Sequence, residues 1–261
     1  MTAVSGGITL PANWNLYGRT AGYSAPAPLD ALPALSGIIN ISSGTDPVIL
    51  DSFALTGSNS HNAVLAIISV NNLMLHNVNV SNTAVGGLGL FVAASSLHFS
   101  GTNNISGNGN AGSTGIAGML VSSNSIVNFD SGTTNIIGQG DNTSNYGIYF
   151  DSSTLNFNGG NVSVITGGPH SYGINAEASS GPSYMNIASS LASGSITVNS
   201  SATGNPNYGI YTSDSFSHLQ IDNTDVTSGA ALTSYITFSS SSPSLGQAVS
   251  WTGNNNIALS W

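Results

Sequence analysis

The sequence predicts an all-β protein, a right-handed parallel β-helix in which each coil gives one strand to each of three sheets. Three observations predict it: short apolar alternations, turn residues between them, and the return of the same strands in the same order. The unit is clearest over 145–168, where the alternations 148–150, 155–157 and 162–164 are separated by Ser, Thr, Asn, Gly and Asp. Such a unit is too small to bury its own apolar side chains, so neighbouring coils must share a core.

Three strand series recur along the chain. The middle strands end at Leu75, Phe99, Phe129, Phe157, Ile187 and Ile221, with steps of 24, 30, 28, 30 and 34 residues. The third strands are marked by Val80, Ile105, Ile136, Val164, Val198 and Val226, and the first strands by Ile116, Ile148, Ile174, Ile210 and Ile236. The tripeptide Tyr-Gly-Ile also recurs, at 146–148, 172–174 and 208–210. An antiparallel sandwich or barrel has short strands too, but recurrence in threes favours the β-helix.

The chain divides into three parts. Residues 1–36 do not fit the repeat, because prolines at 26, 28 and 33 forbid a central strand, and we expect an irregular N-terminal cap or linker. Its aromatic residues, including Trp14 and Tyr17, are expected to seal the first coil. Residues 37–240 form the predicted β-helix, and residues 241–261 a C-terminal coil or cap.

The composition excludes several classes of partner. Only 4% of residues are charged, against roughly 25% in an ordinary soluble domain. Arg19 is the single cation beside ten acids, so we expect no nucleic acid and no anionic membrane surface as partner. Cysteine is absent, which removes thiol chemistry, and no apolar run approaches the ~20 residues that insertion into a membrane needs. The first ten residues show no secretion signal.

Alternation assigns each strand residue to a face. In the clearest unit, Ile148, Phe150, Leu155 and Phe157 are expected to point inward. The second-strand positions 98, 128, 156, 186 and 220 carry His, Asn, Asn, Asn and Gln, and are expected to form an outward column. Amide side chains in such a column can hydrogen-bond from coil to coil.

The strongest candidate site lies on the outward face of the first strands. Stacking of the coils produces two neighbouring outward columns. The first contains Tyr149, Asn175 and Tyr211, and the second contains Asp151 and Glu177. Three interpretations stay open: a structural row, a surface that binds a glycan or a partner, and a catalytic carboxylate pair. Asp151 and Glu177 would lie one coil apart at ~5 Å, a separation like that of a retaining glycosidase, and tyrosines can stack on sugars.

Other chemistry is weakly indicated, and we expect no metal site and no cofactor. The run 137–141 resembles a calcium-binding Gly/Asp repeat but occurs once, and Asp222 and Asp225 flank a turn. The histidines, His61, His76, His98, His170 and His218, lack metal-ligand spacing. A lyase for acidic sugars would need basic residues beyond Arg19, and an ice-binding solenoid would need an outward threonine array that the sequence lacks.

Tyr-Gly-Ile followed by Leu-Asn-Phe, Asn-Gly-Gly and Val-Ser-Val resembles secreted bacterial β-strand-repeat exoproteins, over about residues 37–240. These include filamentous-haemagglutinin-like adhesins and autotransporter passengers. The resemblance implies a large secreted or cell-surface protein that acts in adhesion or surface assembly. Together with the low charge and the outward face described above, we expect a non-catalytic adhesin or structural solenoid that binds a glycan or a host or cell-surface protein and can self-associate end to end. A glycan-active hydrolase that uses Asp151 and Glu177 is the alternative.

Overall fold

The computed structural model describes the chain from Ser5 to Thr252 with gaps. The described residues are 5–11, 14–19, 26–44, 47–60, 62–84, 86–109, 116–140, 144–168, 171–177, 179–181, 183–188, 195–202, 207–212, 217–222, 225–228, 234–238 and 249–252. Beyond residue 186 this description is of the backbone, apart from the side chain of Ile210. Within these ranges the regular secondary structure is entirely β, and none of them contains a helix that could cross a membrane.

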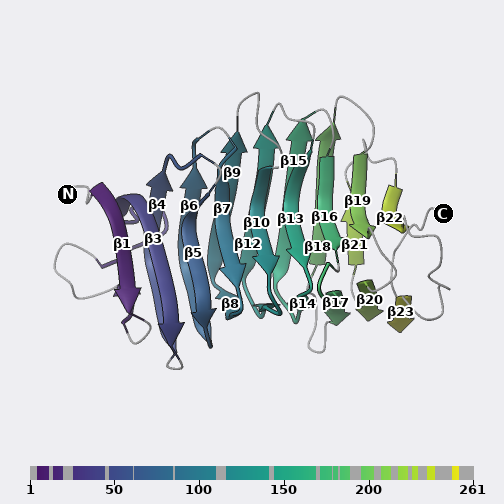
Figure 1. The fold of residues 1–261 in the computed structure, drawn as a ribbon, viewed down its shortest axis with the longest axis horizontal. Helices are drawn as coiled ribbons and strands as arrows, with labels where there is room; N and C mark the ends of the chain where they lie inside the picture. The colour runs from purple at the N-terminus through teal and green to yellow at the C-terminus, as the bar shows by residue number, and fades with distance from the viewer. Residues whose placement is uncertain are drawn as a thin grey trace.

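The strands form one elongated stack, with β1 at one end and β22 and β23 at the other (Figure 1). The first sheet contains β1 (Ser5–Pro11), β3 (Ala34–Gly44), β5 (Ala63–Val70), β7 (Leu88–Ala93), β10 (Ile116–Ser122), β13 (Asn145–Asp151), β16 (Ser171–Glu177), β19 (Asn207–Thr212) and β22 (Ser234–Phe238). The second contains β2 (Leu16–Tyr17), β4 (Val48–Gly57), β6 (Leu73–Asn82), β8 (Ser96–Ser100), β11 (Ile126–Phe129), β14 (Thr154–Phe157), β17 (Ser183–Ala188), β20 (Ser217–Asp222) and β23 (Val249–Thr252). The third contains β9 (Thr102–Gly109), β12 (Thr133–Gly140), β15 (Asn161–Gly168), β18 (Ser195–Ala202) and β21 (Asp225–Ser228).

Strand pairing confirms the predicted parallel β-helix. Strand β11 pairs in parallel with β8 before it and β14 after it, and β10 and β12 pair in the same way within their own sheets. Strands β4 and β6 each continue from the second sheet into the third, since residues 73–76 of β6 pair with β8 and residues 79–82 pair with β9. Each coil therefore hydrogen-bonds to the next along three faces.

Stacking begins inside the segment 1–36 that the sequence assigned to a cap. Strand β1 pairs in parallel with residues 36–42 of β3, and residues 34–36 pair with residues 54–56 of β4. The expected aromatic seal is not formed by Trp14 or Tyr17, whose side chains are exposed. Leu10 and Leu16 pack against the core instead, because aliphatic side chains at these positions face the coil interior.

The core lies between the three sheets and consists of aliphatic and phenylalanine side chains. Ile148, Phe150 and Leu155 are buried as alternation predicts. Phe99, Phe129 and Phe157 occupy one column, and their rings stack with centroids 5.1 Å and 4.8 Å apart. Offset ring stacking contributes ~0.5–1.5 kcal/mol per pair beyond the burial of apolar area. The repeat of one residue type at one position thus stabilises contacts between coils.

The glycine of Tyr-Gly-Ile marks an interruption in the strand register of the first sheet. Tyr146 pairs with Tyr172 and Ile148 with Ile174, but Gly147 and Gly173 take no part in the register. A Cβ on Gly147 would lie 2.1 Å from the Val164 side chain and 2.6 Å from the carbonyl oxygen of Gly173. Gly147 is therefore a packing requirement, because the Val164 side chain of its own coil and the backbone of the next coil both lie too close for a Cβ.

A column of buried serines fixes the corner between the first and second sheets. The backbone N–H of Ser95 donates to Oγ of Ser125 at 3.2 Å, that of Ser125 to Oγ of Ser153 at 3.2 Å, and that of Ser153 to Oγ of Ser183 at 3.4 Å. Each Oγ in turn donates to a backbone carbonyl near its own corner. Buried backbone donors need such partners, so these serines are part of the scaffold.

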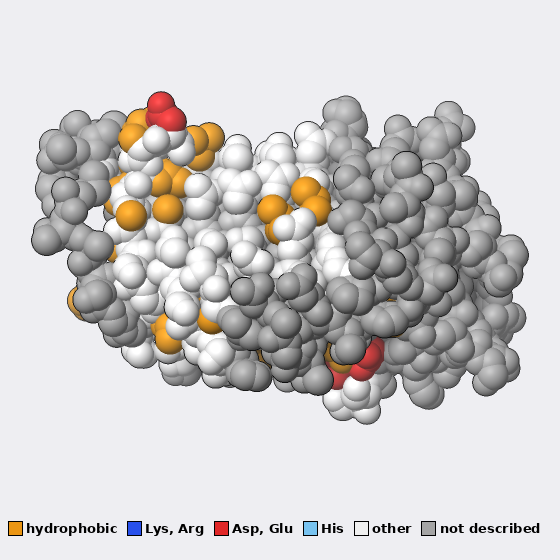
Figure 2. Space-filling view, turned by 90° about the horizontal axis from the view of Figure 1, so that it is seen from above, with side chains coloured by type: hydrophobic (Ala, Val, Ile, Leu, Met, Phe, Trp, Pro, Cys, Tyr) orange, Lys and Arg blue, Asp and Glu red, His pale blue; other side chains and the backbone are white. Residues whose placement is uncertain are grey.

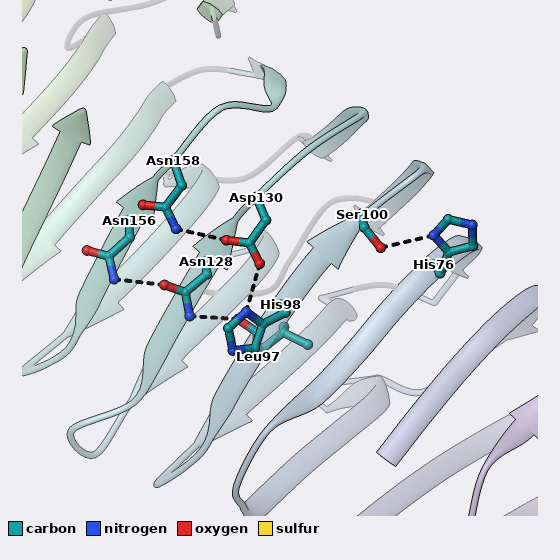
Figure 3. A network of polar contacts seen from close by, with 8 residues as sticks. All are labelled: His76, Leu97, His98, Ser100, Asn128, Asp130, Asn156 and Asn158. Atoms are coloured by element: carbon teal, nitrogen blue, oxygen red, sulfur yellow. Dashed lines mark hydrogen bonds and ion pairs between the residues drawn. The ribbon is translucent and has the colours of Figure 1, made fainter. Parts of the chain in front are cut away.

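The predicted amide column is confirmed at Asn128, Asn156 and Asn186 on the outer face of the second sheet, and the side chain of Gln220 lies outside the described part of the structure. Nδ2 of Asn156 donates to Oδ1 of Asn128 at 2.9 Å (Figure 3). Nδ2 of Asn186 in turn donates to Oδ1 of Asn156 at 2.8 Å. His98 shares the register but pairs diagonally, with its Nδ1 2.7 Å from Oδ2 of Asp130. A second amide ladder on the third sheet, Asn79, Asn104 and Asn135, repeats the pattern at 2.7 Å and 2.8 Å.

Candidate functional site

Strands β13, β16 and β19 bring the predicted site residues together. Tyr149 is the register partner of Asn175, which is the partner of Tyr211, and Asp151 is the partner of Glu177. The two acids therefore stand on adjacent strands, which lie ~4.8 Å apart. The side chain of Tyr211 lies outside the described part of the structure.

Glu177 is held by its neighbours on both carboxylate oxygens. The Tyr149 hydroxyl donates to Oε2 at 2.5 Å, and Nδ2 of Asn175 donates to Oε1 at 3.3 Å. The Tyr149 bond crosses from one coil to the next, so it both positions the carboxylate and ties β13 to β16.

Asp151 is held on one carboxylate oxygen only. Its Oδ1 accepts hydrogen bonds from the Ser152 hydroxyl at 2.9 Å and from the backbone N–H of Ser179 at 2.8 Å. Oδ2 receives no hydrogen bond from the described residues. Because directly opposed like charges destabilise a sheet, the Asp151–Glu177 pair costs free energy that these hydrogen bonds offset in part.

Asn175 is buried, although alternation predicts that its side chain faces the solvent. Its amide lies on the outer face, against Glu177, yet the residue is only 2% exposed. Its Oδ1 has no hydrogen-bond partner among the described residues. A buried amide carbonyl without a partner is costly, so this position calls for a physical explanation.

Two tyrosines that the sequence analysis did not include extend the site. The rings of Tyr146 and Tyr172 stack at 5.2 Å, and Tyr146 meets Tyr149 edge to face at 5.2 Å. All three side chains are partly exposed. The available signal was the Tyr of Tyr-Gly-Ile itself. The alternation of buried and partly exposed residues shifts by one at Gly147 and Ile148, and Tyr146 and Tyr149 therefore lie on the same face.

Burial, followed by the hydrogen bond and negative charge of Glu177, raises the pKa of the Tyr149 hydroxyl above its ordinary value of about 10. Below pH ~10 this tyrosine is neutral in both folded and unfolded chains. At higher pH the unfolded chain releases the proton and the folded chain keeps it, so folded-state stability is lost as pH rises.

We therefore expect the melting temperature of the parent protein to fall more steeply than that of Tyr149→Phe between about pH 8 and pH 11. The measurement is thermal unfolding followed by circular dichroism at fixed ionic strength, with EDTA present. The other tyrosines remain in both proteins, so the comparison isolates Tyr149. Equal slopes would show that its hydroxyl is not protected in the folded chain.

The remaining polar candidates do not form a second site in the part of the chain that the structure describes. His76 Nδ1 lies 2.9 Å from the Ser100 hydroxyl, and His98 pairs with Asp130 (Figure 3). No group of three or more His, Cys, Asp or Glu side chains gathers among the described residues. Asp141 of the run 137–141, the side chains of Asp222 and Asp225, and those of His61, His170 and His218 fall outside them.

The described surface of the protein carries little charge. Arg19 is the single cation of the sequence, and its guanidinium lies 4.7 Å from the ring centroid of Tyr17, near the N-terminal end of the stack. Figure 2 shows a described surface of mainly uncharged side chains and backbone, with small apolar groups and few acids. No arginine or lysine is therefore available to neutralise Asp151 and Glu177.

Comparisons with protein-family models, curated proteins and solved structures give no match for this chain.

Proposed function

We propose that this chain is a non-catalytic β-solenoid of a secreted or cell-surface protein, with a structural and adhesive role. The outer face of the first sheet binds a glycan or a partner at the cell surface. We call this surface the tyrosine face, and it consists of Tyr146, Tyr149, Tyr172, Asp151 and Glu177. The observation that carries the proposal is the cluster of three contacting, partly exposed tyrosine rings on a sheet.

The chemistry of tyrosine supports this assignment. A tyrosine ring presents an apolar body and a polar tip, which suits both sugar rings and protein surfaces. Ring stacking and the Tyr149–Glu177 hydrogen bond hold the cluster rigid, so that little conformational entropy is lost on binding. The low charge of the surface favours neutral ligands over anionic ones.

Binding to a glycan array and to fixed cells tests the proposal. We expect Tyr172→Ala to weaken binding at least tenfold, which corresponds to ~1.4 kcal/mol. Tyr184→Ala is the matched control, because this tyrosine is 39% exposed on the second sheet, away from the tyrosine face. Binding that both variants lose equally, or that neither loses, would contradict a role for the tyrosine face.

The direct opposition of Asp151 and Glu177 favours one alternative, a retaining glycan hydrolase. A hydrolase of this kind would cleave at least one substrate of a glycan panel and lose that activity in Glu177→Gln. Absence of hydrolysis by the parent and the variant alike would exclude it, and we expect that result because both oxygens of Glu177 are engaged by neighbouring side chains.

A further inference from the structure

The turn between β14 and β15 contains an Asn-Gly pair, Asn158 and Gly159, outside both strands. Asparagine is a chemically labile residue, and a following glycine makes it more so. Glycine has no side chain to shield its backbone nitrogen, and its backbone rotates more freely than that of other residues. The nitrogen of Gly159 is therefore a potential nucleophile toward Cγ of Asn158.

The backbone around Gly159 leaves this nitrogen available. The N–H groups of Asn158 and Gly160 both donate to the carbonyl of Phe129, at 2.9 Å and 3.4 Å, but the N–H of Gly159 donates to no acceptor among the described residues. The side chain of Asn158 is exposed. Both reacting groups are thus free of the constraints that protect most asparagines in a folded sheet.

The other Asn-Gly pair of the sequence, Asn108 and Gly109, lies inside a strand. Asn108 is the register partner of Gln139 and Gly109 that of Gly140, in the ladder between β9 and β12. A backbone held in a ladder must open locally before its nitrogen can turn toward the side chain. The fold therefore distinguishes two pairs that the sequence presents as equal.

The side-chain amide of Asn158 links its coil to the coil before. Its Nδ2 donates to Oδ1 of Asp130 at 2.8 Å, and Oδ2 of Asp130 lies 2.7 Å from Nδ1 of His98 (Figure 3). A carboxylate at position 158 could not donate this hydrogen bond. It would instead oppose the negative charge of Asp130 on the neighbouring coil, which destabilises a sheet.

We propose that Asn158 is a site of spontaneous deamidation, at which a neutral amide is replaced by a carboxylate beside Asp130 and the contact between two coils is weakened. The change accumulates with time and requires only water. It limits the lifetime of the intact stack at one defined coil.

The reaction balances without an oxidant or a reductant. The nitrogen of Gly159 forms a bond to Cγ of Asn158, and Nδ2 leaves as ammonia, taking up the proton that Gly159 loses. The product is a cyclic succinimide. Water then adds to either of its two carbonyl carbons and breaks the bond to nitrogen, which gives aspartate or isoaspartate. Isoaspartate also adds a methylene to the backbone of the turn between β14 and β15.

Incubation of the full chain at neutral pH, followed by pepsin digestion and peptide mass spectrometry, tests the site. Pepsin is suitable because the chain offers trypsin a single cation, Arg19. We expect Asn158 to deamidate at least about tenfold faster than Asn108, a ratio that requires an opening free energy of only ~1.4 kcal/mol at β9. In urea, where both pairs are unfolded, the two rates should be similar. A folded chain that keeps Asn158 intact, or that reacts equally at both pairs, would overturn the proposal.

Gly159→Ala supplies a matched variant. The φ angle of Gly159 lies outside the left-handed region, and the nearest atom to the new Cβ would be the backbone oxygen of Asp130 at 3.2 Å. The added methyl group hinders attack by the nitrogen, so deamidation at Asn158 should slow while that at Asn108 stays unchanged. An unchanged rate at Asn158 would contradict attack by the Gly159 nitrogen.

The consequence for stability is tested with Asn158→Asp, which reproduces one product, and Asn158→Ala, which removes the hydrogen bond without adding charge. We expect Asn158→Asp to have the lower melting temperature of the two at low ionic strength, and salt to narrow the difference by screening the repulsion from Asp130. An aspartate variant as stable as the alanine variant would overturn the inferred weakening. Neither experiment involves the tyrosine face, so this proposal and the proposed function fail separately.

Discussion

Asn82→Ala is expected to destabilise the protein by about 4 kcal/mol, the largest loss that we predict for one substitution. Asn82 is fully buried at the end of β6. Its Nδ2 lies within 3.0 Å of the carbonyl oxygens of Asn59, Asn62 and Leu88, and its Oδ1 accepts from the backbone N–H groups of Asn59 and Ala84. Alanine would leave these backbone groups without partners, and each such group costs ~1–3 kcal/mol when buried.

The matched control is Asn104→Ala, on the outer amide ladder. Asn104 bonds only to the side chains of Asn79 and Asn135 in the described structure, and water can replace both contacts. The Asn104→Ala variant should therefore lose less than about 1 kcal/mol of unfolding free energy. Urea unfolding of the parent and both variants measures the difference, and comparable losses for Asn82→Ala and Asn104→Ala would contradict the internal role of Asn82.

The structural role of Asn82 could not be found from the sequence repeat, because the equivalent residues in neighbouring coils are glycines. Its register partners are Gly57 in the coil before and Gly107 in the coil after, and Gly138 follows in the same column. A search for like residues at like positions finds glycines there and passes over the asparagine. The hydrogen bonds of Asn82 need residues 59 and 62 on one side and residues 84 and 88 on the other, and only the folded chain brings these together.

Those parts of the fold that depend on local alternation and on period could be predicted from the sequence. The middle-strand column Phe99, Phe129 and Phe157 and the amide ladder were both correct, because parallel in-register stacking places identical positions next to each other. The extent of stacking into residues 5–11 was not predicted. Strand β1 repeats the Ser-Gly-x-Ile pattern of residues 36–39 in its partner β3, and the prolines at 26, 28 and 33 between the two strands concealed this match.

The candidate site was predicted in register but not in detail. Sequence periodicity aligned Asp151 with Glu177 and Tyr149 with Asn175, as the structure shows. It could not show that Tyr149 reaches across a coil to Glu177 or that Asn175 is covered, because side-chain direction and burial depend on neighbours from other coils. The abundant serines carried no signal at all, although four of them form the buried corner column.

Gly147→Ala tests the physical basis of the Tyr-Gly-Ile repeat and should cost about 3 kcal/mol. The new Cβ would overlap Val164 at 2.1 Å and the Gly173 carbonyl at 2.6 Å, and the second contact is with backbone that the adjacent coil holds in place. Gly181→Ala is the control, because the nearest atoms to its Cβ would lie at 3.9 Å and 4.0 Å, in ordinary contact.

The position of Gly147 in the stack makes the consequence larger than a local clash. In a repeat protein, stability depends on the interfaces between neighbouring units, and β13 pairs with β10 on one side and β16 on the other. We expect the Gly147→Ala variant to unfold at lower urea concentration than the parent. Its transition should also be broader, because the two halves of the stack no longer unfold in a single cooperative step. Limited proteolysis should then cleave the variant faster than the parent. A variant as stable as Gly181→Ala would mean that the recurring glycine is not required by packing between coils.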